Sequence, residues 1–212
     1  MRLFVAVWPP PEAVAHLDAA LDPVRAADDA RGVRWQPPSR WHLTVAFLGE
    51  LADERCEQAR DRLARTAVRH RPTPPVRLAG AGTFGRGMLW VGVRDADASG
   101  PVDAAGAGTP AGAGTPAGPS GLAALAGLAR SVQGALRRSG FAVEERAWRP
   151  HVTLARMRSG RPDPRPLARA LASYEGPPWS VASLALVRST TGPQPRYDDV
   201  AVLPLGRADP TT

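Results

Sequence analysis

The chain carries one short pattern twice, as Arg40-Trp-His42-Leu-Thr44-Val-Ala46 and as Arg149-Pro-His151-Val-Thr153-Leu-Ala155. Each copy reads Arg, any residue, His, an apolar residue, Thr, an apolar residue and Ala. The two histidines are 109 residues apart, one in each half of a chain with only four histidines. A single His-x-Thr is a weak signal, but the matched contexts of this pair point to a shared function.

The alternation of apolar and polar residues in each copy predicts a β-strand. Successive side chains of a strand point to opposite faces, so Leu43, Val45 and Phe47 are expected in a core. His42 and Thr44 then share the other face with the small alanine that ends the pattern, and the second copy repeats the arrangement. If the two halves are related by a pseudo-two-fold axis, two imidazoles and two hydroxyls converge across a polar cleft on one small anion.

Hydrophobic periodicity predicts a mixture of strands and helices without strict alternation. This order favours an α+β fold with mainly antiparallel sheet over a doubly wound parallel sheet. The predicted strands cover about 1–8, 41–48, 76–79, 88–94, 147–156, 179–188 and 197–203, and the predicted helices about 11–28, 51–69, 121–138 and 164–173.

The segment 96–120 differs in composition from the rest of the chain. Residues 105–110, Ala-Gly-Ala-Gly-Thr-Pro, recur as residues 111–116. Such a segment has no large side chains to bury and cannot offset the entropy of ordering itself. We therefore expect one domain, residues 1–212, built of two lobes and interrupted by a disordered low-complexity insertion at about 96–120.

The basic residues exclude some functions and permit others. The formal net charge is +7, and all 27 basic residues are arginine. Without lysine, neither a lysine–AMP adduct nor a Walker-type phosphate loop can form. Arginine suits phosphate recognition through its planar donor fork, so an anionic partner such as RNA is permitted.

Cysteine and hydropathy set further expectations. The single Cys56 excludes an internal disulfide and a multi-thiolate zinc site, and its place on an apolar stripe predicts a buried residue. No acidic cluster has metal-ligand spacing, so no metal or cofactor is expected. No apolar run is long enough to span a bilayer, and Met1–Trp8 lacks a signal-peptide cleavage site, so the expected location is cytoplasmic.

These residues resemble the two-histidine (2H) phosphoesterase superfamily. More narrowly, the chain is similar to the RNA 2′,3′-cyclic phosphodiesterases once called 2′-5′ RNA ligases. The resemblance extends over nearly the whole chain outside 96–120, and it is carried by residues 1–7, 42–49, 89–92, 149–156, 184–189, 197 and 202–205. It implies a bilobal fold of two related α+β lobes with the active site between them.

The resemblance also implies residue roles. His42 would be the general acid and His151 the general base, while Thr44 and Thr153 would hold the phosphate oxygens. Arg156 matches an arginine that follows the second motif in this family and would add positive charge. A regular strand would place Arg156 on the face opposite His151, so this role requires a bulge or a strand end there.

The implied reaction opens a 2′,3′-cyclic phosphate at an RNA end to a 2′-phosphomonoester, without metal or cofactor. ATP-independent 2′-5′ ligation would be a side activity, and a monomer is expected. Two alternatives stay open: a cyclic phosphodiesterase acting on a small nucleotide, and a catalytically silent RNA-binding module. An unrelated basic scaffold protein is supported only by the charge and the low-complexity tract.

Contacts with a substrate beyond the phosphate are less specified by the sequence. Phe84, Trp35 and Trp41 are candidates to stack on a base, with core packing as the alternative for each. Arg40 and Arg149 flank the two histidines and are expected to extend a positive track for RNA. The other two histidines, residues 16 and 70, are expected to be ordinary surface residues.

Overall fold

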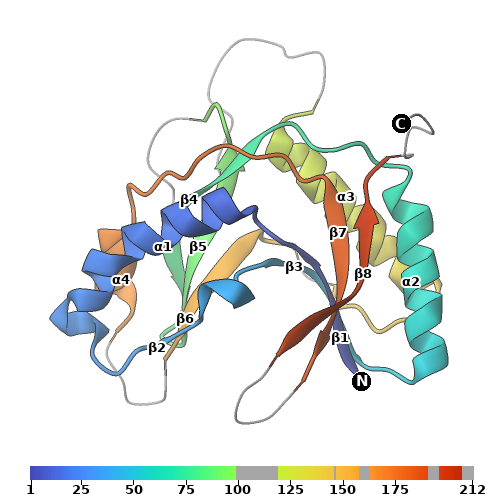
Figure 1. The fold of residues 1–212 in the computed structure, drawn as a ribbon, viewed down its shortest axis with the longest axis horizontal. Coiled ribbons are helices and arrows are strands. Elements are labelled where there is room, and N and C mark those ends of the chain that lie inside the picture. The colour runs from blue at the N-terminus through green and yellow to red at the C-terminus, as the bar shows by residue number, and fades with distance from the viewer. Residues whose placement is uncertain (99–118, 146, 158–162, 191–195, 207–212) are drawn as a thin grey trace.

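An antiparallel sheet of eight strands, flanked by helices, forms the framework of the computed structural model (Figure 1). The structure describes residues 1–98, 119–145, 147–157, 163–190 and 196–206. The strands are β1 (Arg2–Val7), β2 (Arg34–Trp35), β3 (Leu43–Glu50), β4 (Val76–Phe84), β5 (Met88–Asp95), β6 (His151–Arg156), β7 (Ser183–Ser189) and β8 (Tyr197–Pro204). The helices are α1 (Pro11–Ala26), α2 (Asp53–Ala67), α3 (Gly121–Arg138) and α4 (Arg165–Ala170), with short 3₁₀ turns η1 (Asp28–Ala30) and η2 (Pro38–Arg40).

The sheet consists of two halves that meet at the two motif strands. Its strand order is β4-β5-β6-β3-β1-β7-β8, with β2 paired to β6. The central strands β3 and β6 are antiparallel and share a single paired position, Leu43 with Val152. Each of these two residues directly follows a motif histidine. The repeated pattern therefore lies at the junction of the halves, and the α+β antiparallel prediction is confirmed.

The helices lie against the apolar face of the sheet. On one half, α4 contacts β4 and β5 and α1 contacts β4, while on the other half α2 contacts β7 and β8. Helix α3 contacts β3, β5 and α2, and so it joins the two halves (Figure 1). Leucines of all four helices are buried in one core with Leu43 and Val152. This single core explains how two halves with so little shared pairing form one unit.

Most predicted elements are found, with shifted ends. The predicted helix over 121–138 is confirmed, and Ser120 caps it by accepting a hydrogen bond from the Ala123 amide. The strand expected at 179–188 begins only at Ser183, because Trp179 instead forms an isolated bridge with Val76 of β4. The two-residue strand β2 was not predicted, since its sequence is too short to show periodicity.

The ends of the low-complexity insertion lie side by side. Asp95, the last residue of β5, accepts a hydrogen bond of 2.6 Å from the Leu122 amide in the first turn of α3. Residues 99–118, which include most of the predicted disordered segment, lie outside the described residues. The two described ends of this segment, at Asp95 and Leu122, are therefore joined by a hydrogen bond.

A β-bulge in β3 corrects one prediction. Strand β1 pairs Val5 with Ala46 and Ala6 with Thr44, so Val45 is an extra residue on β3. After such a bulge the side-chain alternation is displaced by one position. Ala46 is therefore buried, and Phe47, which was expected in the core, is 61% exposed. The prediction for Phe47 was wrong because the bulge cannot be recognised in the hydrophobic pattern.

Strand β6 has the matching bulge. Its neighbour β5 pairs Leu89 with Ala155 and Trp90 with Thr153, so Leu154 is the extra residue. Leu154 and Ala155 are both fully buried, and Arg156 is exposed. This is the irregularity that the predicted role of Arg156 required, and it lies three residues after His151 just as Val45 lies three residues after His42.

Candidate active site

Two histidines lie at the junction of the two halves of the sheet, on the face away from the helices. We call this surface, which carries His42, Thr44, His151 and Thr153, the histidine face. The antiparallel register that pairs Leu43 with Val152 places His42 opposite Thr153 and Thr44 opposite His151. The four predicted site residues are thereby brought together, although they come from the two halves of the chain.

Both imidazoles are oriented by the same backbone contact. Nδ1 of His42 lies 2.6 Å from the Arg40 carbonyl oxygen, and Nδ1 of His151 lies 2.8 Å from the Arg149 carbonyl oxygen. Because a carbonyl oxygen can only accept a hydrogen bond, each Nδ1 is the protonated donor. Each ring thus keeps Nε2 for proton transfer, and the arginine of the repeated pattern marks the residue whose carbonyl sets this tautomer.

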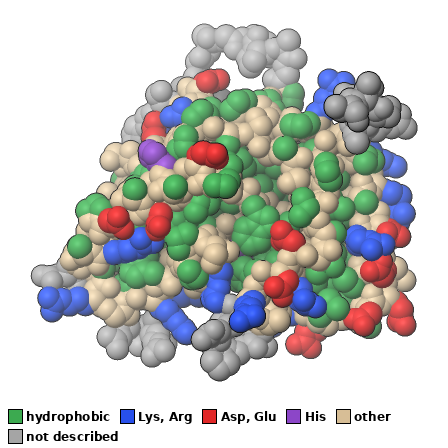
Figure 2. Space-filling view, in the orientation of Figure 1, with side chains coloured by type: hydrophobic (Ala, Val, Ile, Leu, Met, Phe, Trp, Pro, Cys, Tyr) green, Lys and Arg blue, Asp and Glu red, His purple; other side chains and the backbone are tan. Residues whose placement is uncertain are grey.

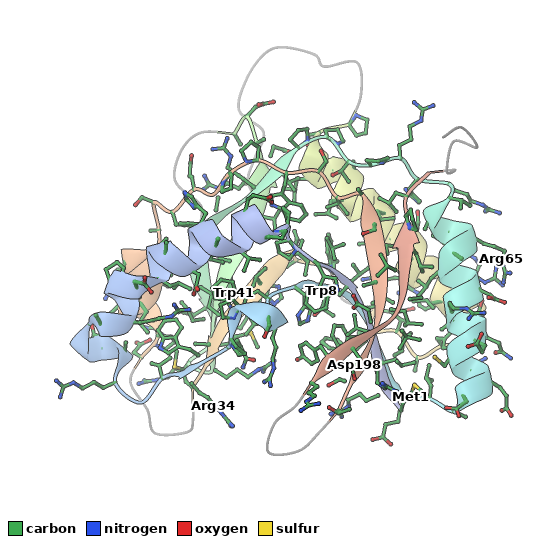
Figure 3. The ribbon with its side chains drawn as sticks, viewed as in Figure 1. Met1, Trp8, Arg34, Trp41, Arg65 and Asp198 are labelled. Atoms are coloured by element: carbon green, nitrogen blue, oxygen red, sulfur yellow. The ribbon has the colours of Figure 1, made fainter. Side chains whose placement is uncertain are left out.

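An aromatic cluster surrounds His42. The ring of His42 lies 4.8 Å from Phe4, 5.4 Å from Trp8 and 5.4 Å from Tyr197, measured between centroids. Phe4 belongs to a small second core on the histidine face, and Trp8 and Tyr197 pack against it. Figure 3 shows Trp8 just beyond the end of β1, where its indole donates to Asp199 at 3.0 Å. These contacts restrict the rotation of the His42 ring.

His151 has aromatic neighbours of its own. Phe84 lies 4.9 Å and Trp90 6.2 Å from its ring, measured between centroids. The Trp90 indole lies over Gly82, where a Cβ atom would overlap the ring, and close to Gly92, which pairs with His151. The glycines of β4 and β5 therefore make room for the aromatic side chain beside this histidine.

The pKa of each site histidine is lowered from its ordinary value. Burial is the main cause for His42; the hydrogen bond to Arg40 opposes it, and the charge of His151 adds to it. Burial also lowers the pKa of His151, opposed by the hydrogen bond to Arg149 and assisted by the charge of Arg156. The two imidazoles are therefore near enough to interact, and Arg156 acts on His151 in particular.

The remaining predicted site residues are placed as follows. Thr44 and Thr153 are half-buried, and the Thr153 hydroxyl lies 3.5 Å from the Met88 sulfur, which is only a weak acceptor. The Thr44 backbone carbonyl accepts a hydrogen bond of 2.7 Å from the Trp148 indole, which ties the approach to β6 onto β3. Among the described residues no hydrogen bond engages the Thr44 hydroxyl, so both hydroxyls retain hydrogen-bonding capacity for another group.

The three aromatic residues considered for base stacking differ in how accessible they are to a substrate. Trp41 is 1% exposed and donates its indole hydrogen to the Gln36 carbonyl, so core packing, the alternative expected for it, is confirmed and stacking on a base is excluded. Trp35 packs against the core beneath the Arg25 guanidinium. Phe84 is 36% exposed beside His151, which leaves it available to a substrate.

Two residues of the histidine face were missed or undervalued in the sequence. Phe47 contacts Phe4 at 6.3 Å and occupies, after the bulge, the position that Arg156 occupies in the second copy. Extending the comparison of the two copies by one residue would have paired Phe47 with Arg156. Tyr197 lies against His42 and under the Arg40 guanidinium, at 5.9 Å. The resemblance to the family included residue 197, but its contact with His42 is a tertiary contact that the sequence does not show.

Three other observations bear on the chemistry. Cys56 is buried, as predicted, and burial raises the pKa of its thiol. Within the described residues, no three His, Cys, Asp or Glu side chains are grouped so as to hold a metal ion. Among the helices of the described ranges, none is both long and apolar enough to cross a bilayer.

Comparison with known protein families assigns the chain to one of them. The model of the LigT-like phosphoesterases matches residues 7–90 and 118–197, and the gap between these ranges covers most of the low-complexity segment. Both motif histidines fall within the matched ranges. The chain belongs to the LigT-like phosphoesterase family, and the resemblance to 2H phosphoesterases is confirmed.

Two relatives carry the name RNA 2′,3′-cyclic phosphodiesterase. The protein of Thermus thermophilus is 32% identical over 198 residues, which cover 92% of this chain and 84% of the relative. The protein of Geobacillus stearothermophilus is 27% identical over 175 residues, which cover 81% of this chain. The chain spans about half, 47%, of the length of the Geobacillus relative.

Solved structures share the fold. A crystal structure of a Thermus thermophilus protein superposes with a TM-score of 0.68 at 24% identity, covering 98% of this chain and 100% of that one. Escherichia coli LigT in complex with NADP⁺ gives a TM-score of 0.65 at 21% identity, covering 97% of this chain and 98% of that one. At these identities the likeness concerns the fold alone.

Proposed function

We propose that this protein hydrolyses RNA 2′,3′-cyclic phosphate ends to 2′-phosphomonoesters by general acid–base catalysis with two histidines. The observation that carries the proposal is the matched pair of imidazoles, each donating Nδ1–H to a backbone carbonyl and presenting Nε2. The names of the two relatives support this reaction for a chain of the same family. Neutral imidazole accepts a proton, and imidazolium donates one, near neutral pH.

In the proposed reaction, His151 and His42 have complementary roles. Nε2 of His151 takes a proton from water as the water oxygen forms a bond to phosphorus. The bond from phosphorus to the 3′ oxygen breaks, and protonated His42 gives its proton to that oxygen. The assignment of base and acid is supported by Arg156, whose charge disfavours protonation of His151.

Charge on the phosphate is stabilised by neighbouring side chains. The Thr44 and Thr153 hydroxyls donate to the non-bridging oxygens, and the Arg156 guanidinium adds positive charge to the same region. These donors are held on two strands of a sheet, so little reorganisation accompanies the reaction. The scheme requires no metal ion and no cofactor.

The decisive experiment uses a short RNA with a 2′,3′-cyclic phosphate end in the presence of EDTA. We expect the wild type to form the 2′-phosphate, and His42→Ala and His151→Ala each to lower kcat by about 100- to 10,000-fold. His16→Ala is the matched control, because His16 is an exposed histidine on α1. Loss of wild-type activity on adding EDTA, or full activity of either site variant, would contradict the proposal.

A second set of substrates separates the remaining alternatives. The same assay with a 2′,3′-cyclic mononucleotide distinguishes an RNA-directed enzyme from one that acts on small nucleotides. Adding an RNA with a 5′-hydroxyl end tests for the 2′-5′ ligation expected as a side activity. A folded wild type that binds RNA but converts none of these substrates would indicate a binding module instead.

A further inference from the structure

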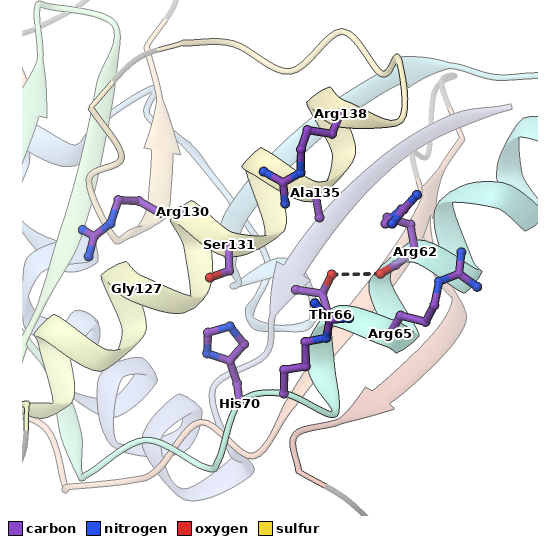
Figure 4. A pocket seen from close by; sticks show the side chains of 10 residues that line it. Arg62, Arg65, Thr66, His70, Gly127, Arg130, Ser131, Ala135 and Arg138 are labelled. Atoms are coloured by element: carbon purple, nitrogen blue, oxygen red, sulfur yellow. Dashed lines mark hydrogen bonds between the residues drawn. The ribbon is translucent and has the colours of Figure 1, made fainter.

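A basic groove lies between α2 and α3, away from the histidine face (Figure 4). Its volume is about 530 Å³. The groove is lined by Arg62, Arg65, Thr66, Arg69, His70, Gly127, Arg130, Ser131, Ala135 and Arg138. Five of these ten residues are arginines, and among the described residues that line the groove none is acidic.

The arginines of the groove lack counter-charges among the described residues. Within this part of the chain, no ion pair or hydrogen bond engages the guanidinium groups of these five arginines. The Nε atom of Arg62 is buried and has no hydrogen-bond partner there. Like charges gathered around one groove repel one another, and a bound anion relieves this repulsion. The groove therefore favours a negatively charged ligand.

The helix dipoles explain only part of this arrangement. Positive residues near the C-terminal end of a helix are favoured by its dipole, which accounts for Arg65 and Arg69 at the end of α2. Arg130 lies in the middle of α3, where the dipole gives no such benefit. The dipole therefore does not account for Arg130, and Arg65 projects outward from α2, where a ligand can reach it (Figure 3).

The dimensions favour a row of phosphates over a single anion. Arg130 and Arg138 are eight residues apart on one helix, a separation of about 12 Å along its axis. Gly134 lies between them and leaves room for the Arg138 guanidinium, because a Cβ atom at this position would approach that group at 3.1 Å. Arginine binds phosphate oxygens through paired N–H donors. The Ser131 side chain adds a hydroxyl group, whereas the Thr66 hydroxyl is buried and already donates to the Arg62 carbonyl at 2.9 Å.

We propose that the α2–α3 groove is a second phosphate-binding site, which holds the backbone of an RNA strand independently of base sequence. The described lining contains no Phe, Tyr or Trp on which bases would stack, so recognition is limited to the backbone. Figure 2 shows basic side chains along the edge of the molecule formed by α2. The choice of RNA as ligand rests on the proposed function, whereas the preference for phosphate rests on the groove itself.

The groove is distinct from the candidate active site. Leu63 of α2 and Leu125 of α3 are buried in the core on the helix-covered face of the sheet. The histidines lie on the other face of the same sheet. Changes at the exposed ends of groove arginines should therefore leave hydrolysis of a cyclic mononucleotide unchanged.

The test is direct binding, measured by fluorescence anisotropy with a labelled 15-nucleotide RNA that ends in a 3′-hydroxyl and so cannot be hydrolysed as a cyclic phosphate. The full chain is compared with Arg65→Ala/Arg130→Ala and with the control Arg137→Ala/Arg169→Ala, which removes the same charge outside the groove. For the groove variant we expect a Kd raised about tenfold or more, and a salt dependence of log K that is shallower by about 0.7 for each lost phosphate contact. The control should stay within about twofold of the wild type.

Several outcomes would overturn the proposal. Equal RNA affinity for the groove variant and the control would remove it, even if the protein hydrolyses cyclic phosphates. Calorimetric titration with inorganic tripolyphosphate gives a second criterion. If the groove variant loses tripolyphosphate binding but keeps the RNA affinity of the wild type, the groove binds a small polyanion instead. Circular dichroism and thermal unfolding verify the fold, and Arg65→Glu/Arg130→Glu should weaken RNA binding further. If the wild type hydrolyses nothing, the binding comparison still decides the role of the groove.

Discussion

The two site histidines have nearly equivalent surroundings but different charged neighbours. Each has its Nδ1 bonded to the carbonyl two residues earlier, and each lies among aromatic rings. The equivalence ends at the residue after each bulge, which is Phe47 in one copy and Arg156 in the other. At the residue scale, this difference gives the two histidines an apolar side chain in one copy and a cationic side chain in the other at the equivalent position.

Replacement of Arg156 by glutamine should move the pH dependence of the reaction. Because both histidine pKa values are lowered, the wild-type maximum of kcat/KM is expected below pH 6.5. The Arg156 charge lowers the pKa of His151, so its removal raises that pKa. If His151 is the base, the acid limb of kcat/KM then moves to higher pH, and activity at pH 5.5 falls more than at pH 8. Arg169→Gln is the control, and an unmoved acid limb for Arg156→Gln would contradict this electrostatic role.

Phe47 is expected to support a base of the substrate. Phe47→Ala should change the free energy of unfolding by less than about 0.5 kcal/mol, because the side chain is largely exposed. Loss of a stacked base costs about 1–3 kcal/mol, so KM for RNA ends should rise at least about fivefold with kcat less affected. Val202→Ala on β8 removes another exposed apolar side chain and should leave KM unchanged. An unchanged KM for Phe47→Ala would argue against stacking at this position.

At the scale of the elements, the strands position the site through irregularities. The bulges at Val45 and Leu154 bury the alanine of each motif and turn the following residue toward the histidine face. A helix and two glycines support this arrangement from the surrounding structure. Gln133 of α3 is buried and donates 2.8 Å to the Val45 carbonyl, while Gly82 and Gly92 make room for Trp90.

Gln133→Met tests the support of the first bulge. The substitution keeps the size of the side chain but leaves the Val45 carbonyl without its buried donor, which costs about 1–3 kcal/mol in stability. Chemical denaturation measures this loss, and kcat should fall as well because Thr44 directly precedes the bulge and His42 lies two residues before Thr44. Gln58→Met on the exposed side of α2 is the control. Unchanged stability for Gln133→Met would show that the bulge does not depend on this contact.

Gly82→Ala tests the fit of Trp90 beside His151. The added methyl group would overlap the indole, so we expect a loss of about 1–3 kcal/mol in stability from overpacking, together with lower activity. Gly87→Ala, in the turn that follows β4, meets no atom within 4 Å and serves as the control. Thermal unfolding and the cyclic phosphate assay measure both effects. If the two variants behave alike, the indole can move without consequence.

At the scale of the whole molecule, the two halves of the sheet share one strand pair and a common core. Helix α3 contacts strands of both halves, and it follows directly on the low-complexity segment in the chain. The hydrogen bond from the Leu122 amide to Asp95 fixes the start of α3 beside the end of β5. The position of α3, and with it the support that α3 gives to the site, therefore depends in part on this hydrogen bond between α3 and β5.

Deletion of residues 100–118 should leave the fold and the activity intact. The described flanks are already adjacent, so a short connection closes without displacing β5 or α3. The entropy of closing a loop also changes only slowly with its length. The melting temperature and cyclic phosphate hydrolysis of the deletion variant are compared with those of the full chain. Loss of folding would mean that the segment contributes contacts of its own.

The sequence by itself determined the α+β class, the position of most helices and strands, and the placement of each motif histidine on the same strand face as its threonine. This was possible because hydrophobic periodicity indicates which face of an element is buried, and because the same seven-residue pattern occurs twice in the chain. Only the tertiary structure decided which residues share the histidine face beyond the threonines. A bulge displaces the alternation without changing the composition, so Phe47 and Arg156 were assigned to the wrong face by simple counting.

Contacts between distant segments were also invisible in the sequence. The ring of Tyr197 beside His42, the support of Val45 by Gln133 and the gathering of arginines from two helices into one groove all arise from packing. Trp41 shows the reverse case, since its aromatic character suggested a substrate contact and the core buried it instead. Local patterns reveal which residues can do chemistry, whereas the packing of the elements decides which of them meet.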